Sequence, residues 1–301
     1  MRILVTGAAG FVGQHLTRLL RSRGEEVIDW CFSGSRTGSG VQLDLCDAQA
    51  VSRQDMQGID AIVHLAGLAQ VGRSFSEPQL FMSVNTAVVT NLFEVLIAQQ
   101  SRPRVLVVST GGVYSADTER ITEESPVAPS NPYVVSKLAQ EMLAAYYAKR
   151  DFEVIVARPF NHVGPGQQPG YLVADLCSQV ASLERAGGGT LTVGDLSSAR
   201  DYTDVRDVAA AYHALLQHGR SGEIYNVCSG TSCSGGQILQ KICSLTSVEL
   251  TVERSEALRR PTEASVVNAS NAKLRRDTHW EPTIPLDQTL ADTLSYWRET
   301  A

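Results

Sequence analysis

Residues 5–13 read VTGAAGFVG, and this stretch decides the fold. Its glycines, Gly7, Gly10 and Gly13, recur at every third position between an apolar run and the amphipathic residues 14–22, so they lie where a strand turns into a helix. Glycine permits a tight turn and lets the backbone approach an anion closely. Free N–H groups and the positive end of the helix dipole then favour a phosphate. The stretch therefore predicts a phosphate-binding turn, although the spacing alone also occurs in ordinary strand-to-helix turns.

Short apolar runs alternate with longer amphipathic stretches through the first half of the chain. The runs at residues 26–32, 61–65 and 105–109 are rich in Val, Ile and Leu, and residues 86–99 are long enough for a helix. Strands with few polar positions are buried on both faces, which a parallel sheet covered by helices requires. The pattern predicts an α/β fold, a Rossmann-type doubly wound parallel sheet that begins at the glycine turn.

The composition excludes several classes of protein. The chain has 26 basic and 32 acidic side chains and a formal net charge of −6, so no general positive field favours nucleic acid or an acidic membrane. We find no run of about eighteen apolar residues and no secretion signal, and we expect a cytoplasmic protein without a membrane-spanning helix. The six cysteines show no C-x-x-C pair or metal-like cluster, so they are expected to be buried thiols, with no metal site.

The end of the second apolar run indicates which dinucleotide the turn would bind. Rossmann folds that prefer NAD place Asp or Glu there, about twenty residues after the turn, to bind the adenosine ribose. Here residues 30–33 read WCFS, and Asp29 comes too early. Ser33, Ser35 and Arg36 could instead bind a 2′-phosphate, because a guanidinium pairs well with phosphate oxygens. We expect NADP(H), with NAD(H) as the alternative, although Arg36 could also be a solvated loop charge.

The alternation of strands and helices loosens beyond residue 160, where loops rich in Gly and Pro and a triple glycine at residues 187–189 interrupt the chain. We expect residues 1–160 to form the dinucleotide-binding domain and residues 161–301 to form mainly a smaller C-terminal lobe. Two apolar runs, at residues 155–158 and 225–228, could still return to the main sheet.

Three side chains form a candidate catalytic group. Thr110 follows an apolar run, and Tyr133 and Lys137 stand one helical turn apart, so they share a face. A tyrosine titrates near pH ~10, and a neighbouring ammonium is expected to lower the pKa of Tyr133 by stabilising the phenolate. Tyr133 could then exchange a proton with a hydroxyl or carbonyl, with Thr110 orienting the reacting oxygen and Lys137 binding the nicotinamide ribose. The Y-x-x-x-K spacing is common by chance, but its combination with Thr110 and the glycine turn predicts an oxidoreductase.

These motifs together resemble the extended short-chain dehydrogenase/reductase family, in its nucleotide-sugar branch, along essentially the whole chain. Residues 44–45 (DL) would flank the adenine, residues 64–67 (HLAG) would form the loop under the cofactor, and Asn85 follows in the next helix. The resemblance implies a nucleotide-diphosphate sugar as the substrate. The residues expected to bind the cofactor are Gly7, Gly10, Phe11, Val12, Gly13, Arg36, Asp44, Leu45, Leu65, Ala66, Gly67, Asn85, Tyr133 and Lys137.

Later segments are most similar to branch members that use NADPH to reduce the C4 keto group of GDP-4-keto-6-deoxy-D-mannose to GDP-D-rhamnose. These are residues 158–167 (RPFNHVGPGQ), 200–208 (RDYTDVRDV) and 225–230 (YNVCSG). A buried diphosphate needs neutralising charge, and arginines can supply it, although charges here could also pair with one another across the lobe interface. Arg206 is expected to be structural, paired with an acidic neighbour. The resemblance implies a substrate site made of Thr110, Tyr133, Asn161, Arg200, Arg260 and Glu263.

One position bears on the choice between reduction and dehydration. Sugar 4,6-dehydratases of this family keep an acidic residue after the catalytic Thr or Ser, whereas residues 110–112 here read TGG. A dehydratase is therefore disfavoured. Deoxymannose reductases also often carry an acid where Gly112 stands, so the chain departs from those relatives as well.

Two other activities remain open from the sequence. A nucleotide-sugar 4-epimerase would oxidise and re-reduce its substrate with tightly held NAD, and a regulatory NADP-binding module would have no turnover. The family resemblance also implies a homodimer in which two helices from each subunit form a four-helix bundle. Residues 86–99 and 136–149 are amphipathic enough for this role, although their apolar faces could equally belong to the core.

Overall fold

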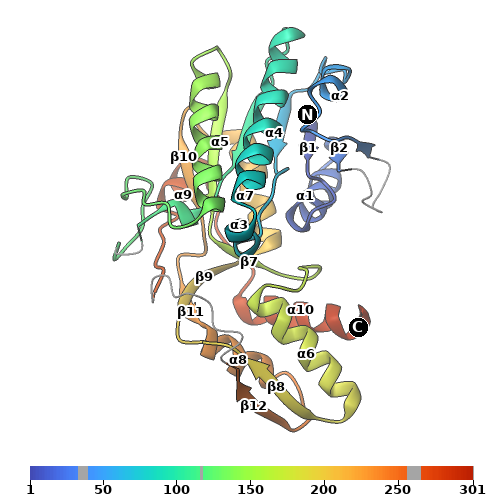
Figure 1. Cartoon of the computed structure of the whole chain (residues 1–301), viewed down its shortest axis with the longest axis vertical. Coiled ribbons are helices and arrows are strands. Elements are labelled where there is room, and N and C mark those ends of the chain that lie inside the picture. The colour runs from blue at the N-terminus through green and yellow to red at the C-terminus, as the bar shows by residue number, and fades with distance from the viewer. Residues whose placement is uncertain (33–39, 116–117, 256–265, 301) are drawn as a thin grey trace.

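The main element of the fold is a seven-stranded sheet. A computed structural model describes residues 1–32, 40–115, 118–255 and 266–300. Its main sheet has the order β10-β6-β5-β4-β1-β2-β3, and all neighbouring strands are parallel (Figure 1). The predicted Rossmann-type sheet is confirmed. The strands are β1 (Arg2–Thr6), β2 (Glu26–Cys31), β3 (Val41–Gln42), β4 (Ala61–His64), β5 (Arg104–Val108), β6 (Val154–Pro159) and β10 (Ile224–Val227).

Helices cover both faces of this sheet. One pair packs with the core on one face, a second pair packs with the core on the opposite face, and shorter helices lie in the connections. They are α1 (Phe11–Ser22) with α7 (Val205–His218), α4 (Pro78–Ala98) with α5 (Pro132–Ala148), and the short α2 (Ala48–Ser52), α3 (Val71–Ser76), α9 (Ala272–Thr278) and 3-10 turn η1 (Gly111–Val113).

The strand order reverses beside β1. From β1 the chain builds β2 and β3 on one side, then crosses to build β4, β5, β6 and β10 on the other. In open α/β sheets a ligand crevice forms at such a reversal, outside the carboxyl ends of the strands. The glycine turn follows β1 directly and the HLAG segment spans the end of β4, so both lie at this crevice.

A smaller lobe lies below the main sheet in Figure 1 and has its own apolar core. It contains a three-stranded sheet, β11-β9-β7, and a parallel pair, β12-β8. Because α7 and β10 belong to the main sheet and its helical cover, the chain returns there after building β7 to β9. The division at residue 160 therefore stays a prediction. The elements of the lobe are β7 (Asn161–Val163), β8 (Gly189–Val193), β9 (Ala199–Asp204), β11 (Ser232–Ser234), β12 (Leu250–Arg254), α6 (Leu172–Ala186), α8 (Gly235–Cys243) and α10 (Leu286–Thr300).

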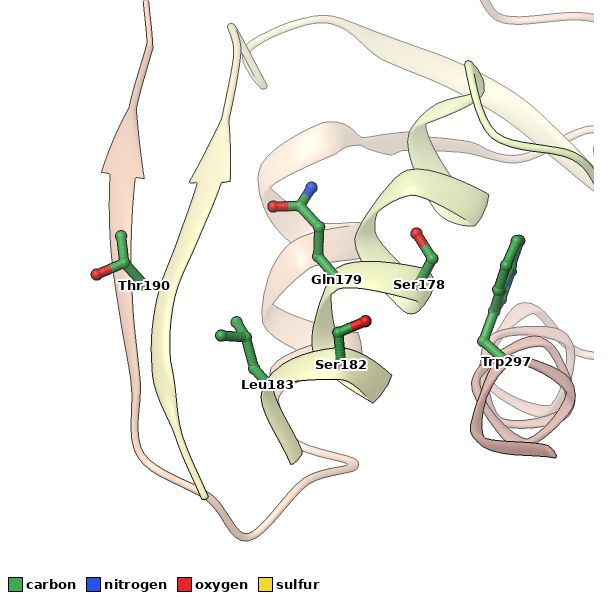
Figure 2. Close-up of a pocket in the computed structure, with 6 residues that line it drawn as sticks. All are labelled: Ser178, Gln179, Ser182, Leu183, Thr190 and Trp297. Atoms are coloured by element: carbon green, nitrogen blue, oxygen red, sulfur yellow. The ribbon is translucent and has the colours of Figure 1, made fainter. Parts of the chain in front are cut away.

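The smaller lobe contains a pocket of about 310 Å³ between α6, β8 and α10 (Figure 2). The indole Nε1 of Trp297 is buried there, with no hydrogen-bond partner in the described part of the chain. Of the described residues, no charged side chain and none of the expected site lines the pocket, whose lining is Ser178, Gln179, Ser182, Leu183, Thr190 and Trp297. The pocket is therefore separate from the crevice at the main sheet.

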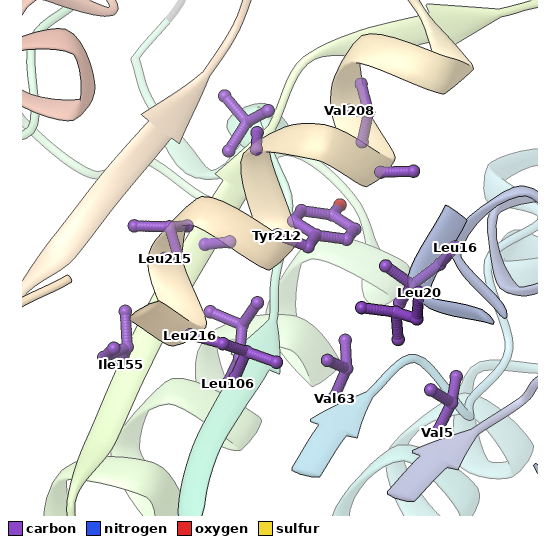
Figure 3. Packing of buried hydrophobic residues seen from close by; sticks show 14 of the residues in the cluster. Val5, Leu16, Leu20, Val63, Leu106, Ile155, Val208, Tyr212, Leu215 and Leu216 are labelled. Carbon is purple, nitrogen blue, oxygen red and sulfur yellow. The ribbon is translucent and has the colours of Figure 1, made fainter. Parts of the chain in front are cut away.

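The main sheet is buried on both faces by large apolar side chains. On one face, Leu106 of β5 packs in the same core as Leu16 of α1 and Tyr212 of α7 (Figure 3). Successive strand residues point to opposite faces, so Val5 belongs to this core whereas Leu4 belongs to the core under α4 and α5. This double cover explains why the strand sequences are almost continuously apolar.

We expected no segment long and apolar enough to span a membrane, and α4 is an exception to this expectation. Its 21 residues are long and apolar enough by composition. In the structure, however, it packs extensively against α5, and Val88, Leu92 and Phe93 are buried in the core under the sheet. The apolar character of α4 is accounted for by this packing.

We expect Gly13→Ala to destabilise the fold. A Cβ at position 13 would lie 2.3 Å from the carbonyl oxygen of Gly7, so α1 would have to move away from the turn. The free energy of unfolding should fall by about 1–3 kcal/mol, measured by urea denaturation. Gly72→Ala in α3 is the control, because a Cβ there meets nothing within 4 Å and should leave stability unchanged or raise it by about 0.4–1 kcal/mol. Equal stabilities of the two variants would contradict this account.

Candidate active site

The glycine turn presents a helix N-terminus to the crevice. Gly7 has a φ of +70° and lies against the backbone of Ala66, and Gly10 is the N-terminal cap of α1. No side chain caps this helix and its first turn, which Phe11 and Val12 begin, contains no acidic residue. The first N–H groups of a helix have no partner within the helix, so they remain available for an anion. This arrangement fits the pyrophosphate of a dinucleotide.

The loop after β4 forms one wall of the crevice. Leu65 and Ala66 donate their N–H groups to the backbone oxygen and the hydroxyl of Thr6, both at 3.2 Å. Asn85 is fully buried behind this loop, where its Oδ1 accepts the N–H of Leu68 at 2.7 Å. A Cβ on Gly67 would lie 2.7 Å from the same Oδ1, so the loop passes Asn85 too closely for a side chain. Asn85 therefore fixes the loop.

The adenine end of the crevice is only partly described. Asp44 is exposed and accepts the N–H of Cys46 at 2.9 Å, while Leu45 is buried and its carbonyl accepts a hydrogen bond from Asn91. Asp29 forms an ion pair with Arg21 of α1 at 2.7 Å. Its carboxylate is thus engaged by α1. Arg36, Ser33 and Ser35, expected at a 2′-phosphate, lie outside the described residues.

The structure brings Thr110 and Tyr133 together. Thr110 caps η1 at the end of β5, where its Oγ1 accepts the N–H of Gly112 at 3.1 Å. Asn131 caps α5 by accepting the N–H of Val134 at 3.0 Å, which sets Tyr133 in the first turn of that helix. The side chain of Thr110 lies close enough to Tyr133 to lower the pKa of its hydroxyl. The reacting oxygen of a substrate would therefore find both hydroxyls at one point.

The pKa of Tyr133 is shifted in the direction opposite to our expectation. Part of the side chain is accessible to solvent, yet burial among neighbouring atoms raises its pKa to about 12, against the smaller lowering effect of Thr110. Lys137 is not among the groups that shift this pKa. The expected lowering by the ammonium is therefore wrong here, because Lys137 does not act on Tyr133 and burial raises the pKa. A protonated Tyr133 suits donation of a proton.

Lys137 lies in a buried polar cluster under the crevice. Burial lowers its pKa to about 8, while the charge of Glu141 raises it. Its Nζ donates to Oε1 of Gln140, and Nε2 of Gln140 donates to the backbone oxygen of Asn85 at 2.7 Å. Gln140 thus fixes the ammonium to α4. We did not single out Gln140 in the sequence, although it lies one turn beyond Lys137 on the same helix.

His64 lies below the same cluster at the end of β4. Burial, assisted by the charge of Lys137, lowers its pKa to about 3. Its Nδ1 is 2.9 Å from the hydroxyl of Thr6, which already accepts the N–H of Ala66. Which of the two groups donates in this bond depends on the tautomer of the neutral ring, and Nε2 is buried without a partner among the described residues.

Only some of the residues expected to bind substrate lie in the described part of the chain. Asn161, exposed at the start of β7, pairs in register with Tyr202 of β9, the strand that also carries Arg200. Both thus belong to one small sheet, but Arg260 and Glu263 lie outside the described residues. Arg206 binds Asp204 and Asp292, each at 2.7 Å, so its predicted structural role is confirmed.

The substrate side of the site contacts the glycine turn directly. The ring of Phe11 stacks on His162 of β7 with centroids 6.0 Å apart, and Nε2 of His15 lies 2.8 Å from the carbonyl oxygen of Pro165. These contacts join α1 to β7 and the loop after it. The crevice is therefore bounded by both parts of the molecule.

Gly112 leaves open space beside Thr110. A Cβ there would be 3.4 Å from the nearest atom, on Val134, which is an ordinary contact. A Cβ on Gly111, in contrast, would lie 2.8 Å from the ring of Phe160. Packing therefore explains the glycine at position 111 but not the one at 112. The absence of an acid at position 112 is therefore not imposed by the packing of the fold.

Comparison with known proteins agrees with this geometry. Residues 3–228 match the model of the family described as the NAD dependent epimerase/dehydratase family. The chain belongs to this family. It is 35% identical to GDP-6-deoxy-D-mannose reductase of Pseudomonas aeruginosa, over 98% of this chain and 97% of the relative. It is also 31% identical to GDP-6-deoxy-D-talose 4-dehydrogenase of Aggregatibacter actinomycetemcomitans, over 85% of this chain and 84% of the relative.

Solved structures show the same relationship. The NADPH complex of the Pseudomonas aeruginosa protein RMD matches the whole of both chains with a TM-score of 0.91 and 33% identity. The NAD complex of UDP-glucose 4-epimerase from Thermus thermophilus also matches both chains fully, with a TM-score of 0.86 and 28% identity. Membership of the NAD dependent epimerase/dehydratase family confirms the predicted resemblance, the predicted enzyme class and the dinucleotide cofactor of the NAD(P) type.

The buried His64 should make stability depend on pH. Its folded pKa lies below that of the unfolded chain, so below pH about 6.5 unfolding takes up a proton that the folded protein excludes. This contribution to stability is complete above pH about 6.5 and is lost toward pH about 3, with a slope of about 1.4 kcal/mol per pH unit. His64→Asn, whose amide can still hydrogen-bond the hydroxyl of Thr6, should flatten the pH dependence of the unfolding free energy measured in urea.

His218→Asn is the control for this experiment, because that side chain is exposed at the end of α7. It should keep the wild-type pH dependence. If His64→Asn and the wild type give parallel curves, His64 is not held neutral by burial.

Proposed function

We propose that this member of the NAD dependent epimerase/dehydratase family uses NADPH to reduce the C4 keto group of GDP-4-keto-6-deoxy-D-mannose, forming GDP-D-rhamnose. The observation that carries the proposal is that the side chains of Tyr133 and Thr110 interact, one helical turn from the buried Lys137, with no acid at Gly112. This arrangement offers one proton donor and one orienting hydroxyl, which ketone reduction needs. The 35% identity to GDP-6-deoxy-D-mannose reductase supports this substrate.

The residues of the crevice have distinct roles in the proposed reaction. The bound dinucleotide supplies the hydride that adds to C4. Thr110 donates a hydrogen bond to the keto oxygen, and Tyr133, which its raised pKa keeps protonated, donates the proton that converts the developing alkoxide into a hydroxyl. Lys137 binds the nicotinamide ribose with its ammonium. Holding the two reactants in line supplies much of the rate.

Different sets of residues would hold the cofactor and the nucleotide sugar. The glycine turn from Gly7 to Gly13 would hold the pyrophosphate of the cofactor, and Arg36 would select its 2′-phosphate. Asn161 and Arg200 would hold the sugar and diphosphate of the substrate, together with Arg260 and Glu263. The support for the first set is the uncapped helix N-terminus, and for the second the resemblance in sequence.

A 4-epimerase is the second candidate. UDP-glucose 4-epimerase of Streptococcus mutans is 30% identical over 94% of this chain and 92% of the relative. An epimerase retains its cofactor and consumes no net NADPH, so cofactor stoichiometry separates the two activities. A regulatory module without turnover is disfavoured because Thr110, Tyr133 and Lys137 are all present. The cytoplasmic location stays a prediction.

The activity is tested with the purified full chain, NADPH and GDP-4-keto-6-deoxy-D-mannose. We expect absorbance of the reduced cofactor to fall as GDP-D-rhamnose forms, faster with NADPH than with NADH. Tyr133→Phe should lower kcat by about 10²- to 10⁴-fold, because the proton donor is removed. Tyr146→Phe, at an exposed position on the same helix, should leave kcat unchanged.

Three outcomes would change the assignment. Oxidation of NADPH only with a UDP- or dTDP-linked keto sugar would replace the substrate. Interconversion of C4 epimers without net use of NADPH would favour the epimerase. Wild-type turnover in Tyr133→Phe would remove Tyr133 from the mechanism.

We also propose that the chain forms a homodimer through α4 and α5. The support is a stripe of exposed apolar side chains along α5: Val135 is 41% exposed, Met142 75% and Tyr146 52%. Their spacing places them on one helical face, which would be covered in a four-helix bundle. The family resemblance favours the same pair of helices.

The dimer is tested by sedimentation velocity. We expect the wild type to sediment as a dimer and Met142→Glu to shift it to the monomer, because a charge would be buried in the bundle. Met142→Leu keeps the position apolar and should remain dimeric. A monomeric wild type, or a Met142→Glu variant that stays dimeric, would exclude this interface.

A further inference from the structure

A buried ion pair lies directly behind the proposed catalytic side chains. Nε and Nη2 of Arg158 in β6 bind the two carboxylate oxygens of Glu141 in α5, at 2.9 and 2.6 Å. Only 5% of the arginine side chain and 8% of the glutamate side chain are exposed. Removing two charges from water costs several kcal/mol each, so a buried pair adds little net stability compared with well-packed apolar residues. Stability alone therefore does not explain why this pair is buried here.

The pair connects the elements that carry the catalytic group. Ser109, the residue before Thr110, donates its hydroxyl to Oε1 of Glu141. The guanidinium of Arg158 also lies over the ring of Tyr114, 4.8 Å from its centroid, at the end of the turn that Thr110 begins. Glu141 thus fastens the helix of Tyr133 and Lys137 to both sides of Thr110.

The charge of Glu141 also acts on Lys137, which lies one helical turn earlier. Among the described residues, the other groups facing this cluster supply no negative charge: Gln140 is a neutral amide, His64 is neutral because burial lowers its pKa to about 3, and Arg158 is positive. Tyr133, on the same helix, stays protonated because its pKa is raised to about 12. Glu141 is the group whose charge opposes the effect of burial on the Lys137 ammonium.

We propose that Glu141, held by Arg158 and Ser109, is a positioning residue that sets Thr110 against Tyr133 and places a carboxylate one helical turn from Lys137. This inference rests on the proposed function, because it assigns Glu141 to the same site. Glu141 is buried behind the catalytic side chains, so it acts through Thr110 and Lys137 and contacts no substrate. Its loss should therefore lower kcat more than it raises KM for the sugar.

The direction of the pH effect follows from the charge. Without the carboxylate, burial acts on Lys137 unopposed and its pKa falls below about 8. The neutral amine then forms at lower pH, and a neutral amine binds ribose hydroxyls more weakly than an ammonium. The alkaline limit of both turnover and NADPH binding should move to lower pH.

The decisive variant is Glu141→Gln in the full-length protein. We expect the alkaline midpoint of the NADPH dissociation constant, followed by nucleotide fluorescence, to fall by about one pH unit, and that of kcat to fall with it. Arg158→Lys keeps a positive partner for the carboxylate and should retain the wild-type midpoint. Glu184→Gln is the matched control, because it removes a carboxylate from the more exposed pair with Arg298 and should also leave the midpoint unchanged.

A purely structural role would give a different result. Glu141→Gln would then lower the melting temperature while both alkaline midpoints stayed at the wild-type value, and this would overturn the proposal. If Glu141→Gln does not fold, Glu141→Gln combined with Arg158→Met leaves no unpaired buried charge and replaces it in the test, with the same two outcomes. If the wild type reduces no keto sugar, the proposed function fails, but the midpoint of NADPH binding still decides the role of Glu141.

Discussion

The active-site architecture depends on one constraint, the burial of an ammonium. Lys137 lies between the sheet and α4 with only 7% of its surface exposed, and a charge in such a place must be compensated by its neighbours. Gln140 accepts its hydrogen bond, and Glu141 supplies the nearby negative charge. Gln140 donates in turn to the backbone oxygen of Asn85, and Glu141 accepts from Arg158. Both residues therefore also belong to the surroundings of the ammonium. Much of the polar interior of the main domain can be understood as the surroundings of this single charge.

The sequence predicts those parts of the molecule that depend on local patterns. The apolar strands, the glycine turn and the spacing of Tyr133 and Lys137 can be recognised because each is a short run with its own periodicity. The structure confirms the parallel sheet, brings Thr110 to Tyr133 and places the glycine turn beside the loop after β4. The sequence also predicted that Arg206 would pair with an acidic neighbour, which needs only local information.

The remaining features depend on contacts between distant segments. The direction of the Tyr133 pKa shift was wrong in the sequence-based expectation, because the degree of burial is decided by the packing of the whole fold. Glu141 and Arg158 are 17 residues apart on different elements, and no periodicity joins them. A signal for Glu141 did exist, since it follows Lys137 by one helical turn, but a glutamate at that spacing is common on solvated helices. The small sheet that carries Asn161 and Arg200 is harder still to predict from the sequence, because β7 and β11 have three residues each and little apolar pattern.

The contrast between Gly111 and Gly112 bears on how this scaffold could change its chemistry. A Cβ at position 112 would make only ordinary contacts, whereas one at the neighbouring position is blocked by Phe160. The backbone beside Thr110 therefore accepts the first atom of a side chain without a clash. Relatives of this chain include dTDP-glucose 4,6-dehydratase of Streptomyces niveus, 29% identical over 99% of this chain. Position 112 is thus a place where protein engineering could alter the chemistry beside Thr110 while the packing of Phe160 against position 111 is kept.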